Sequence, residues 1–421
     1  MLPWATRAEI LRVWGLGIRV ETGVSVMWLS RWAAEARAVV EKEEAEARKR
    51  RSESWQSWVM EASKGGAARL HAWVKEPRPW IPTSVTVEGK TSYSPSDVAE
   101  ECLVGWTKIW KGKEEAEGIE VVGNWEAAKP PKITGEELRR TLAKFKDKTS
   151  SGMCRWHPKD WDKMGDRGLE CLAGIMNVAE ELGTWPTSQR STALIRLNNE
   201  EGGPGEHRLV GLMPTLYRVW GKLRRRECQE WEDKNQRDYD FACKGRGAVA
   251  EVWDVALADE GARFAGADTA CWAADLSKFY ERIPYGRLVD TARDMGFPSC
   301  MIKLALSMYG GGRYIQYEKA YSGKVHARRG VIAGCSLATT LVKVYMWKVF
   351  DAARALYPGI RLKVYLDDIL LQWVGRAGEG RFVRIEVLIQ AVKHYGSAIR
   401  TDLEALLNTN KTWLISSNKR Y

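Results

Sequence analysis

The 421-residue sequence lacks the marks of several large protein classes. Its eight cysteines are scattered without a Cys-x-x-Cys pair, which argues against a zinc ribbon or a disulfide framework and favours a reducing compartment. No uncharged apolar run reaches the roughly 18–20 residues that a membrane helix needs. Charged residues interrupt Met1–Arg19, so it has no clean signal-peptide core. We therefore expect an intracellular protein of the nucleus or cytoplasm, neither secreted nor bound to a membrane.

The composition is that of a globular protein with an excess of positive charge. Hydrophobic residues make up 45% and charged residues 28% of the chain, which excludes the disordered class. The length suffices for two or three domains. The 65 Lys and Arg outnumber the 54 Asp and Glu, for a formal net charge of +11. This balance favours a polyanionic partner such as nucleic acid.

Breaker residues and capping signals predict how the chain is divided. Up to about residue 130 the pattern is mostly helical, with a long helix expected within Val24–Met60. A loop is expected over Glu76–Pro82 and the Ser/Thr/Gly-rich stretch after it, and a linker over Ala127–Lys132. Thr134-Gly-Glu-Glu137 is a capping box that predicts the start of a helix. From about residue 133, short apolar runs alternate with helical patterns, as in an α/β or α+β domain.

Two predicted strands end in carboxylates. Thr269–Asp275 closes on an acid, and Arg361–Leu366 runs into Asp367 and Asp368 before the apolar run Ile369–Val374. Burying an unpaired carboxylate is costly, so these acids are expected to be paired, hydrogen-bonded or bound to a metal. Asp-Asp alone is also a common turn dipeptide. If the two strands share a sheet edge, their oxygens form a site for Mg²⁺ or Mn²⁺, ions that catalyse in-line displacement at phosphorus.

Two further segments lie between these strands. Arg313–Tyr317 and Gly323–Arg328 predict a β-hairpin that turns at Ser322-Gly323. Gly330–Thr340 is a glycine-punctuated turn that leads into a predicted helix. Its glycines would allow close approach of a substrate or template backbone.

In this order, the motifs resemble those of reverse transcriptases of the non-LTR (LINE-like) retrotransposon kind, from about residue 133 to the C-terminus. Four motifs resemble the family's palm: Asp275-Leu-Ser-Lys-Phe-Tyr280, Gly330–Thr340, Tyr365-Leu-Asp-Asp368 and Leu407-Asn-Thr-Asn-Lys411. Two upstream segments, Ala193–Arg196 and His207–Lys222, are similar to the family's fingers, and Arg313–Arg328 fits the strand pair ahead of the second palm motif.

The resemblance implies partners and residue roles. The partners are an RNA template, a DNA primer, dNTPs and two Mg²⁺ or Mn²⁺ ions. The implied roles are metal ligation by Asp275 and Asp367 with Asp368 beside them, protonation of pyrophosphate by Lys411, triphosphate binding by Arg196 and Arg208, exclusion of a 2′-hydroxyl by Tyr280, and bordering of the template and nascent pair by Ala333 and Gly334.

Two of these assignments have structural alternatives. Tyr280 is alternatively a core aromatic at the start of a helix, although RNA-copying RNA polymerases carry an acid at that place and a tyrosine favours dNTP selection. Six basic residues fall between Arg208 and Arg226 with no acid among them. They are expected to neutralise template phosphates or, alternatively, to form an exposed helix face.

The predicted architecture is a right-hand polymerase of the α+β class. We expect a helical N-terminal region and linker (1–132), fingers (133–265) and a catalytic palm (266–421). Because the chain ends about ten residues after the fourth motif, we expect a truncated enzyme without a thumb, which puts its activity in question. Ala333-Gly334 replaces the family's Gln-Gly, a change that would weaken fidelity or activity. The alternatives are an inactive, nucleic-acid-binding remnant of a retroelement and an RNA-dependent RNA polymerase.

Overall fold

The computed structural model describes residues 38, 41–42, 45–46, 48–61, 84–87, 89–112, 125, 129–197, 208–376 and 381–417. The chain divides into two compact units, Met1–Pro82 and Thr83–Tyr421. In the first unit every described residue from 38 to 61 is helical, as predicted for that part of Val24–Met60. The loop predicted over Glu76–Pro82 lies outside the described residues. The boundaries predicted near residues 132 and 265 stay predictions.

The second unit begins with a hairpin and a long helix. Strands β1 (Val85–Val87) and β2 (Lys90–Ser92) pair antiparallel, so the prediction of a loop after Pro82 is wrong there. The consecutive β-branched residues Val85, Thr86 and Val87 in this Ser/Thr/Gly-rich stretch suit a short ladder. Helix α4 (Pro95–Lys111) follows and buries Trp106 and Trp110.

The described residues of the next part of the chain, within the predicted fingers, contain five α-helices and two strands of a mixed sheet. These elements are α5 (Gly135–Ala143), α6 (Pro158–Asp162), α7 (Asp166–Leu182), β3 (Ser191–Leu197), β4 (Arg208–Leu212), α8 (Thr215–Leu223) and α9 (Arg225–Asn235). The capping box is confirmed: the Glu137 amide donates to Thr134 Oγ1 at 3.3 Å, and the Thr134 amide donates to the Glu137 carboxylate at 3.2 Å. Helix α5 therefore starts where the sequence predicts.

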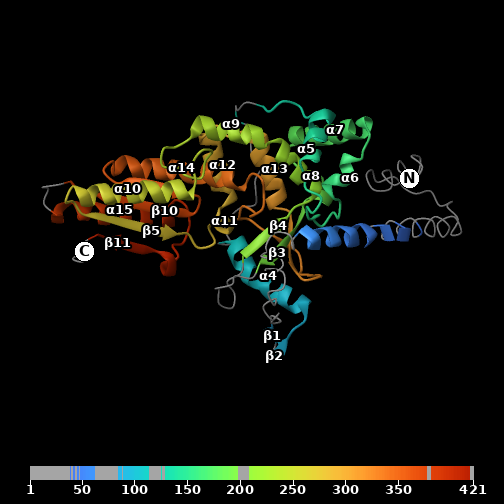
Figure 1. Cartoon of the computed structure of the whole chain (residues 1–421), viewed down its shortest axis with the longest axis horizontal. Helices are drawn as coiled ribbons and strands as arrows, with labels where there is room; N and C mark the ends of the chain where they lie inside the picture. Colours follow the sequence, from blue (N-terminus) through green and yellow to red (C-terminus); the bar gives the residue numbers. More distant parts are fainter. Residues whose placement is uncertain are drawn as a thin grey trace. The chain divides into compact units, whose positions relative to one another are not determined.

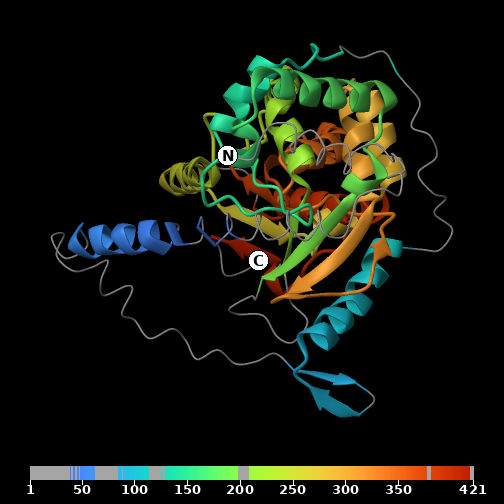
Figure 2. The ribbon, with the colours of Figure 1, turned by 90° about the vertical axis from the view of Figure 1, so that its right-hand side faces the viewer.

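Strands from later in the chain complete this sheet. They are β6 (Gly312–Tyr317), β7 (Ala320–Tyr321) and β8 (Val325–His326). The strand order is β4-β3-β6-β7, and β8 also pairs with β6. Strands β3 and β6 run parallel, while β3 and β4 run antiparallel (Figure 2). The fingers sheet is thus built from segments more than one hundred residues apart.

The predicted hairpin after Arg313 exists, but its turn does not lie at Ser322-Gly323. Tyr317 pairs with Ala320, so Glu318 and Lys319 form the turn, and Glu318 takes a left-handed φ of +53°. Ser322 instead binds strand β6, because its hydroxyl accepts a hydrogen bond from the Ile315 amide at 2.8 Å. The predicted position of the turn was therefore wrong, because the Ser322 side chain bonds to another strand, which the turn dipeptide does not reveal.

The predicted palm contains an antiparallel sheet of order β11-β5-β10-β9. Its strands are β5 (Thr269–Asp275), β9 (Arg361–Tyr365), β10 (Asp368–Val374) and β11 (Trp413–Ser416), which confirms the three strands predicted around the acids. Its helices are α11 (Phe279–Arg282), α12 (Tyr285–Asp294), α13 (Ser299–Tyr309), α14 (Ala338–Leu356) and α15 (Arg381–Thr401) (Figure 1). Helix α10 (Ala248–Phe264), which falls within the range predicted for the fingers, also contacts β10 of this sheet. The mixed architecture confirms the predicted α+β class.

Side chains on β10 alternate between two environments. Ile369 and Leu371 are buried in the core together with Phe350 of α14 and Tyr395 of α15. Gln372 points to the other face, where its amide donates to Asp259 and to the Val255 carbonyl of α10 at 2.9 and 3.1 Å. Helices therefore cover one face of the sheet, and α10 flanks the other.

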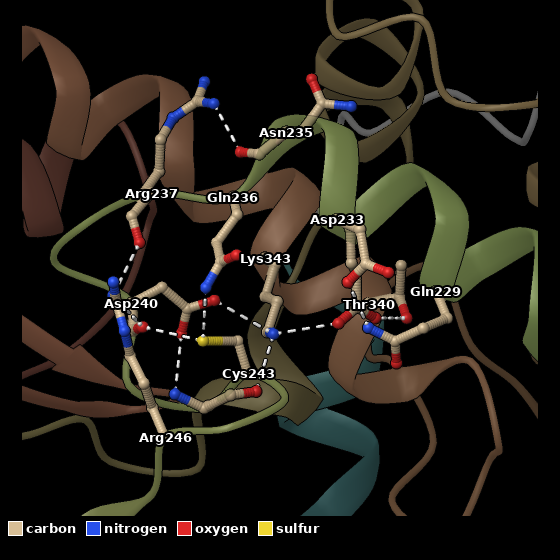
Figure 3. Close-up of polar contacts among 12 residues, drawn as sticks. Gln229, Asp233, Asn235, Gln236, Arg237, Asp240, Cys243, Arg246, Thr340 and Lys343 are labelled. Carbon is tan, nitrogen blue, oxygen red and sulfur yellow. Dashed lines mark hydrogen bonds and ion pairs between the residues drawn. The ribbon is translucent and has the colours of Figure 1, made fainter. Parts of the chain in front are cut away.

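A buried lysine connects α14 of the predicted palm to residues 232–242 of the predicted fingers. Lys343 lies 3.0 Å from carboxylate oxygens of both Glu232 and Asp240, and it donates to the Ala242 carbonyl at 2.7 Å. Figure 3 shows Lys343 and Thr340 of α14 beside the loop that carries Asp240. Both carboxylates are nearly inaccessible to water, so they cannot be stabilised by hydration. The ammonium group of Lys343 compensates their negative charge instead.

We predict that Lys343→Met lowers the free energy of unfolding by about 3–5 kcal/mol, because it removes the cation beside the buried Asp240 and leaves Glu232 with Arg225 as its cation. Lys348→Met is the matched control, since Lys348 lies on the same helix and forms an exposed ion pair with Asp294. That variant should change stability far less. Urea unfolding of both variants measures the difference, and equal losses would contradict the prediction.

Candidate active site

The hairpin between β9 and β10 presents the Asp-Asp pair. Tyr365 and Asp368 are cross-strand partners, so Leu366 and Asp367 form a two-residue loop. Leu366 has a φ of +58°, whereas Asp367 has a negative φ, the combination found in type II′ hairpin turns. A left-handed leucine costs about 1–2 kcal/mol, which the flanking ladder must offset. The turn thereby places both acids at the end of the hairpin.

The structure brings the three predicted acids together. Asp275, the last residue of β5, lies directly opposite Asp368 in the antiparallel ladder. Burial raises the pKa of Asp367, and repulsion from Asp368 and Asp275 raises it further. Burial and repulsion from Asp275 likewise raise the pKa of Asp368. Asp275 is thus close enough to Asp367 and Asp368 to oppose the ionisation of both.

Asn408 holds Asp275 in place. Its side-chain amide donates to Asp275 Oδ2 at 2.9 Å, and its backbone amide donates to the Asp275 carbonyl at 2.9 Å. The sequence motif around Asn408 suggested a role for Lys411 alone. Lys411 ends a short 3-10 turn, Thr409–Lys411, on an exposed surface, and its charge lowers the pKa of Asp368. No local signal marks Asn408, because its partner is 133 residues away.

Glu251 of α10 is a fourth acid beside the site, and it was not predicted from the sequence. Burial, followed by repulsion from Asp368, raises its pKa to about 7. Helix α10 lies on the same face of the sheet as Asp368, because residues 368 and 372 of β10 point to the same side. An acid in the first turn of a helix is common, so no local pattern links Glu251 to a hairpin far along the chain.

Tyr280 lies next to the acids. It sits in α11, five residues after Asp275, and is half-buried. Burial raises the pKa of its hydroxyl, with further contributions from Asp367 and Tyr365. Its neighbour Phe279 is the fully buried aromatic of this turn and contacts Tyr345 with ring centroids 6.2 Å apart. Tyr280 therefore remains partly accessible beside Asp367.

The glycine-rich segment joins the palm to the fingers. The Gly211 amide of β4 donates to the Ala333 carbonyl at 2.7 Å, and Gly334 has a φ of +95°. A side chain at Gly334 would place its Cβ 3.0 Å from the Gly211 carbonyl oxygen, so this position requires glycine. The other end of the segment is tied to the first palm motif, because the Val331 amide donates to the Tyr280 carbonyl at 2.8 Å.

The two predicted triphosphate-binding arginines lie on paired strands. Arg208 is the exposed first residue of β4, and its positive charge lowers the pKa of both Asp367 and Asp368. In the ladder between β3 and β4, Arg208 pairs with Leu197, and Arg196 pairs with the next residue of β4, Leu209. The structure thus places a cation on the fingers within electrostatic reach of the acids.

The prediction that Arg224 contacts template phosphates is wrong. Arg224 is 3% exposed and forms a bidentate ion pair with Glu180, with both nitrogen–oxygen distances at 2.6 Å. Arg225 in turn donates to Glu232 and Thr340 at 3.3 and 2.9 Å. Glu180 lies 44 residues before Arg224, whereas Glu232 follows Arg225 by seven residues. Both acids fall outside the basic segment, so counting charges within that segment alone overstates its free positive charge.

Within the described residues, no group of three or more His, Cys, Asp or Glu side chains is arranged to hold a metal ion. The carboxylate of Asp275 is instead hydrogen-bonded to Asn408. The donor chemistry nevertheless suits a hard divalent cation, because three carboxylates meet at one sheet edge and repel one another. A cation would remove that repulsion.

We predict that Asp367→Asn raises the midpoint of thermal unfolding in metal-free buffer. The variant removes a half-buried negative charge that two neighbouring carboxylates oppose. Asp147→Asn, at an exposed position distant in sequence from these acids, is the control and should leave the midpoint unchanged. A lower midpoint for Asp367→Asn would contradict the prediction, because it would show that the Asp367 carboxylate stabilises the fold even without a metal ion.

Comparison with known proteins agrees with this geometry. Residues 198–420, more than half of the chain, match the family model described as reverse transcriptase (RNA-dependent DNA polymerase). The matched segment includes Asp275, Asp367, Asp368, Tyr280 and Lys411. No curated protein matches the chain. None of the described helices combines the length and apolar character that crossing a bilayer requires. The chain belongs to the reverse transcriptase family.

Proposed function

We propose that the chain is an RNA-directed DNA polymerase of the non-LTR (LINE-like) kind, which joins a dNTP to a primer 3′-hydroxyl on an RNA template. The observation that carries the proposal is the position of Asp275 opposite Asp368, with Asp367 in the adjoining turn. Membership of the reverse transcriptase family supports a polymerase that uses nucleic acid and nucleotides.

Two Mg²⁺ or Mn²⁺ ions are the proposed cofactors. Asp275 and Asp367 would hold them, and Asp368 would add negative charge. When bound, such ions activate the attacking hydroxyl and stabilise the leaving oxygen. The repulsion that Asp367 and Asp368 experience from neighbouring carboxylates supports this assignment, because a bound cation would relieve it.

The positive side chains around the acids have separate roles in the proposal. Arg208 and Arg196, on the paired strands β4 and β3, bind the triphosphate, and Lys411 donates a proton to the departing pyrophosphate. The electrostatic influence of Arg208 and Lys411 on the acids supports both assignments. Phosphoryl transfer needs mainly positioning and charge neutralisation, which these groups supply.

Tyr280 is the proposed sugar gate. Its partly accessible ring beside Asp367 would exclude a 2′-hydroxyl and so select dNTPs. Ala333 and Gly334 would border the template and the nascent base pair. The contact between Ala333 and the fingers strand β4 supports that position, although alanine offers no side-chain amide to hold the template.

Primer extension on poly(rA)/oligo(dT) with Mg²⁺ or Mn²⁺ tests the proposed activity. We predict that the wild-type chain extends the primer and that Asp367→Ala lowers the rate by roughly a hundredfold or more while template–primer binding stays intact. Asp147→Ala should extend normally. Binding without extension by the wild-type chain would identify it as a nucleic-acid-binding protein without polymerase activity.

Sugar selection provides a second test. We predict that Tyr280→Ala incorporates UTP more readily relative to dTTP than the wild type does, because the ring that blocks the 2′-hydroxyl is gone. The ratio of kcat/KM for the two nucleotides measures the change. A wild-type preference for UTP would indicate an RNA polymerase, and an unchanged ratio in the variant would remove the gate assignment.

A further inference from the structure

A buried arginine connects the two segments that carry the sugar gate and the template-bordering loop. Arg313, in β6, is completely inaccessible to water. Its guanidinium group donates to the Gly330 carbonyl at 2.6 Å and to the Arg329 carbonyl at 3.2 Å. It also donates to the Tyr285 hydroxyl at 2.7 Å and to Glu281 Oε2 at 3.3 Å. One side chain therefore contacts the start of the glycine-rich segment and the residue that follows Tyr280.

Glu281 is the counter-charge of this arginine. It is 6% exposed, and its carboxylate also accepts a hydrogen bond from the Trp110 indole N–H at 2.6 Å. The Trp110 ring lies against the guanidinium, with 5.0 Å between the ring centroid and Cζ of Arg313. Helix α4 thus contributes Trp110 to the cluster. The Arg328 amide also donates to the Trp110 carbonyl at 3.0 Å, which fixes the position of Trp110 in the helix.

The segment around Gly330 packs tightly against the segment around Glu281. Gly330 has a φ of +97°, and a Cβ there would lie 3.0 Å from both the backbone and the carboxylate oxygen of Glu281. The Gly330 amide donates to the Ile283 carbonyl at 2.9 Å, and Val331 bonds to Tyr280 as described above. A shift of Glu281 therefore displaces the Tyr280 backbone relative to the loop that leads to Ala333.

The geometry of the guanidinium is what this cluster requires. An arginine presents five donors in a rigid planar fork, whereas a lysine has a single flexible ammonium group. Lysine at position 313 would keep the positive charge for Glu281, but it cannot hold Glu281, Tyr285 and two carbonyls in one fixed arrangement. Arg313→Lys therefore separates the effect of the positive charge, which it keeps, from the effect of the hydrogen-bond geometry, which it removes.

We propose that the Arg313–Glu281–Trp110 cluster is a positioning device that sets the gap between Tyr280 and the Ala333–Gly334 loop, and so determines how strictly the enzyme rejects ribonucleotides. This inference rests on the proposed role of Tyr280 as the sugar gate. A displacement of about 1 Å at a reacting site can change rates a hundredfold, so small changes in this gap are expected to alter discrimination.

The fingers provide a matched control. Arg224, Glu180 and Trp220 form a second buried cluster of the same three residue types, in which the Trp220 indole N–H donates to Glu180 at 2.7 Å. This cluster does not contact Tyr280 or the loop from Gly330 to Gly334 in the bonds that it forms. Its loss should therefore affect stability without affecting sugar choice.

The experiment compares Arg313→Lys, Trp110→Phe, Tyr280→Ala and Arg224→Lys in the full chain. On poly(rA)/oligo(dT), the ratio of kcat/KM for dTTP to kcat/KM for UTP is measured beside thermal unfolding. We expect Arg313→Lys to lower the ratio about tenfold or more. Trp110→Phe removes one hydrogen bond and keeps an aromatic ring, and it should lower the ratio less. Arg224→Lys should leave the ratio unchanged even if its unfolding midpoint falls.

The outcomes separate the inference from the function on which it rests. If Tyr280→Ala lowers the ratio but Arg313→Lys and Trp110→Phe do not, the positioning role is wrong and the gate stands. If none of the three lowers it, or if the wild-type chain does not extend the primer, the gate or the polymerase itself is wrong, and the inference falls with it. Should Arg313→Lys fail to fold, the ratio for Trp110→Phe decides.

Discussion

Antiparallel pairing between β5 and β10 places Asp275 opposite Asp368, and the remaining features of the site are arranged around the charge that this pairing concentrates. The two-residue turn at Leu366 and Asp367 adds a third carboxylate. Like charges at such separations oppose each other's ionisation. The backbone ladder can hold them together because its hydrogen bonds and the core beneath Ile369 and Leu371 offset that cost.

Buried ion pairs hold the segments around these acids. Lys343 joins α14 to the loop at Asp240, Arg224 joins α8 and α9 to Glu180 of α7, and Arg313 joins β6 to Glu281 of α11. Such pairs are rarely better than apolar packing for stability alone, but each demands one particular geometry. By contrast, Arg208 and Lys411 stay exposed next to the acids, where a charged substrate can reach them. Buried and exposed cations thus have different tasks in this fold.

Local patterns predicted the elements that depend on neighbouring residues. The capping box at Thr134 and the strands Thr269–Asp275 and Asp368–Val374 follow from short-range hydrogen bonding and hydrophobic alternation, so they appear where expected. The turn at Glu318-Lys319 and the hairpin β1–β2 were missed. Both depend on weak local signals, and in the first case a side chain of the predicted turn is used to bind another strand.

The sequence by itself determined the α+β class, the acid-bearing strands and the order of the polymerase motifs, because each is written in contiguous residues. Only the tertiary structure decided which charges remain free. Arg224 resembles its basic neighbours in the sequence, yet Glu180 neutralises it, and Asn408 acquires a role through a bond to Asp275. Electrostatic and hydrogen-bond partners are chosen by distance in space, and the folded backbone alone fixes that distance for residues far apart in the chain.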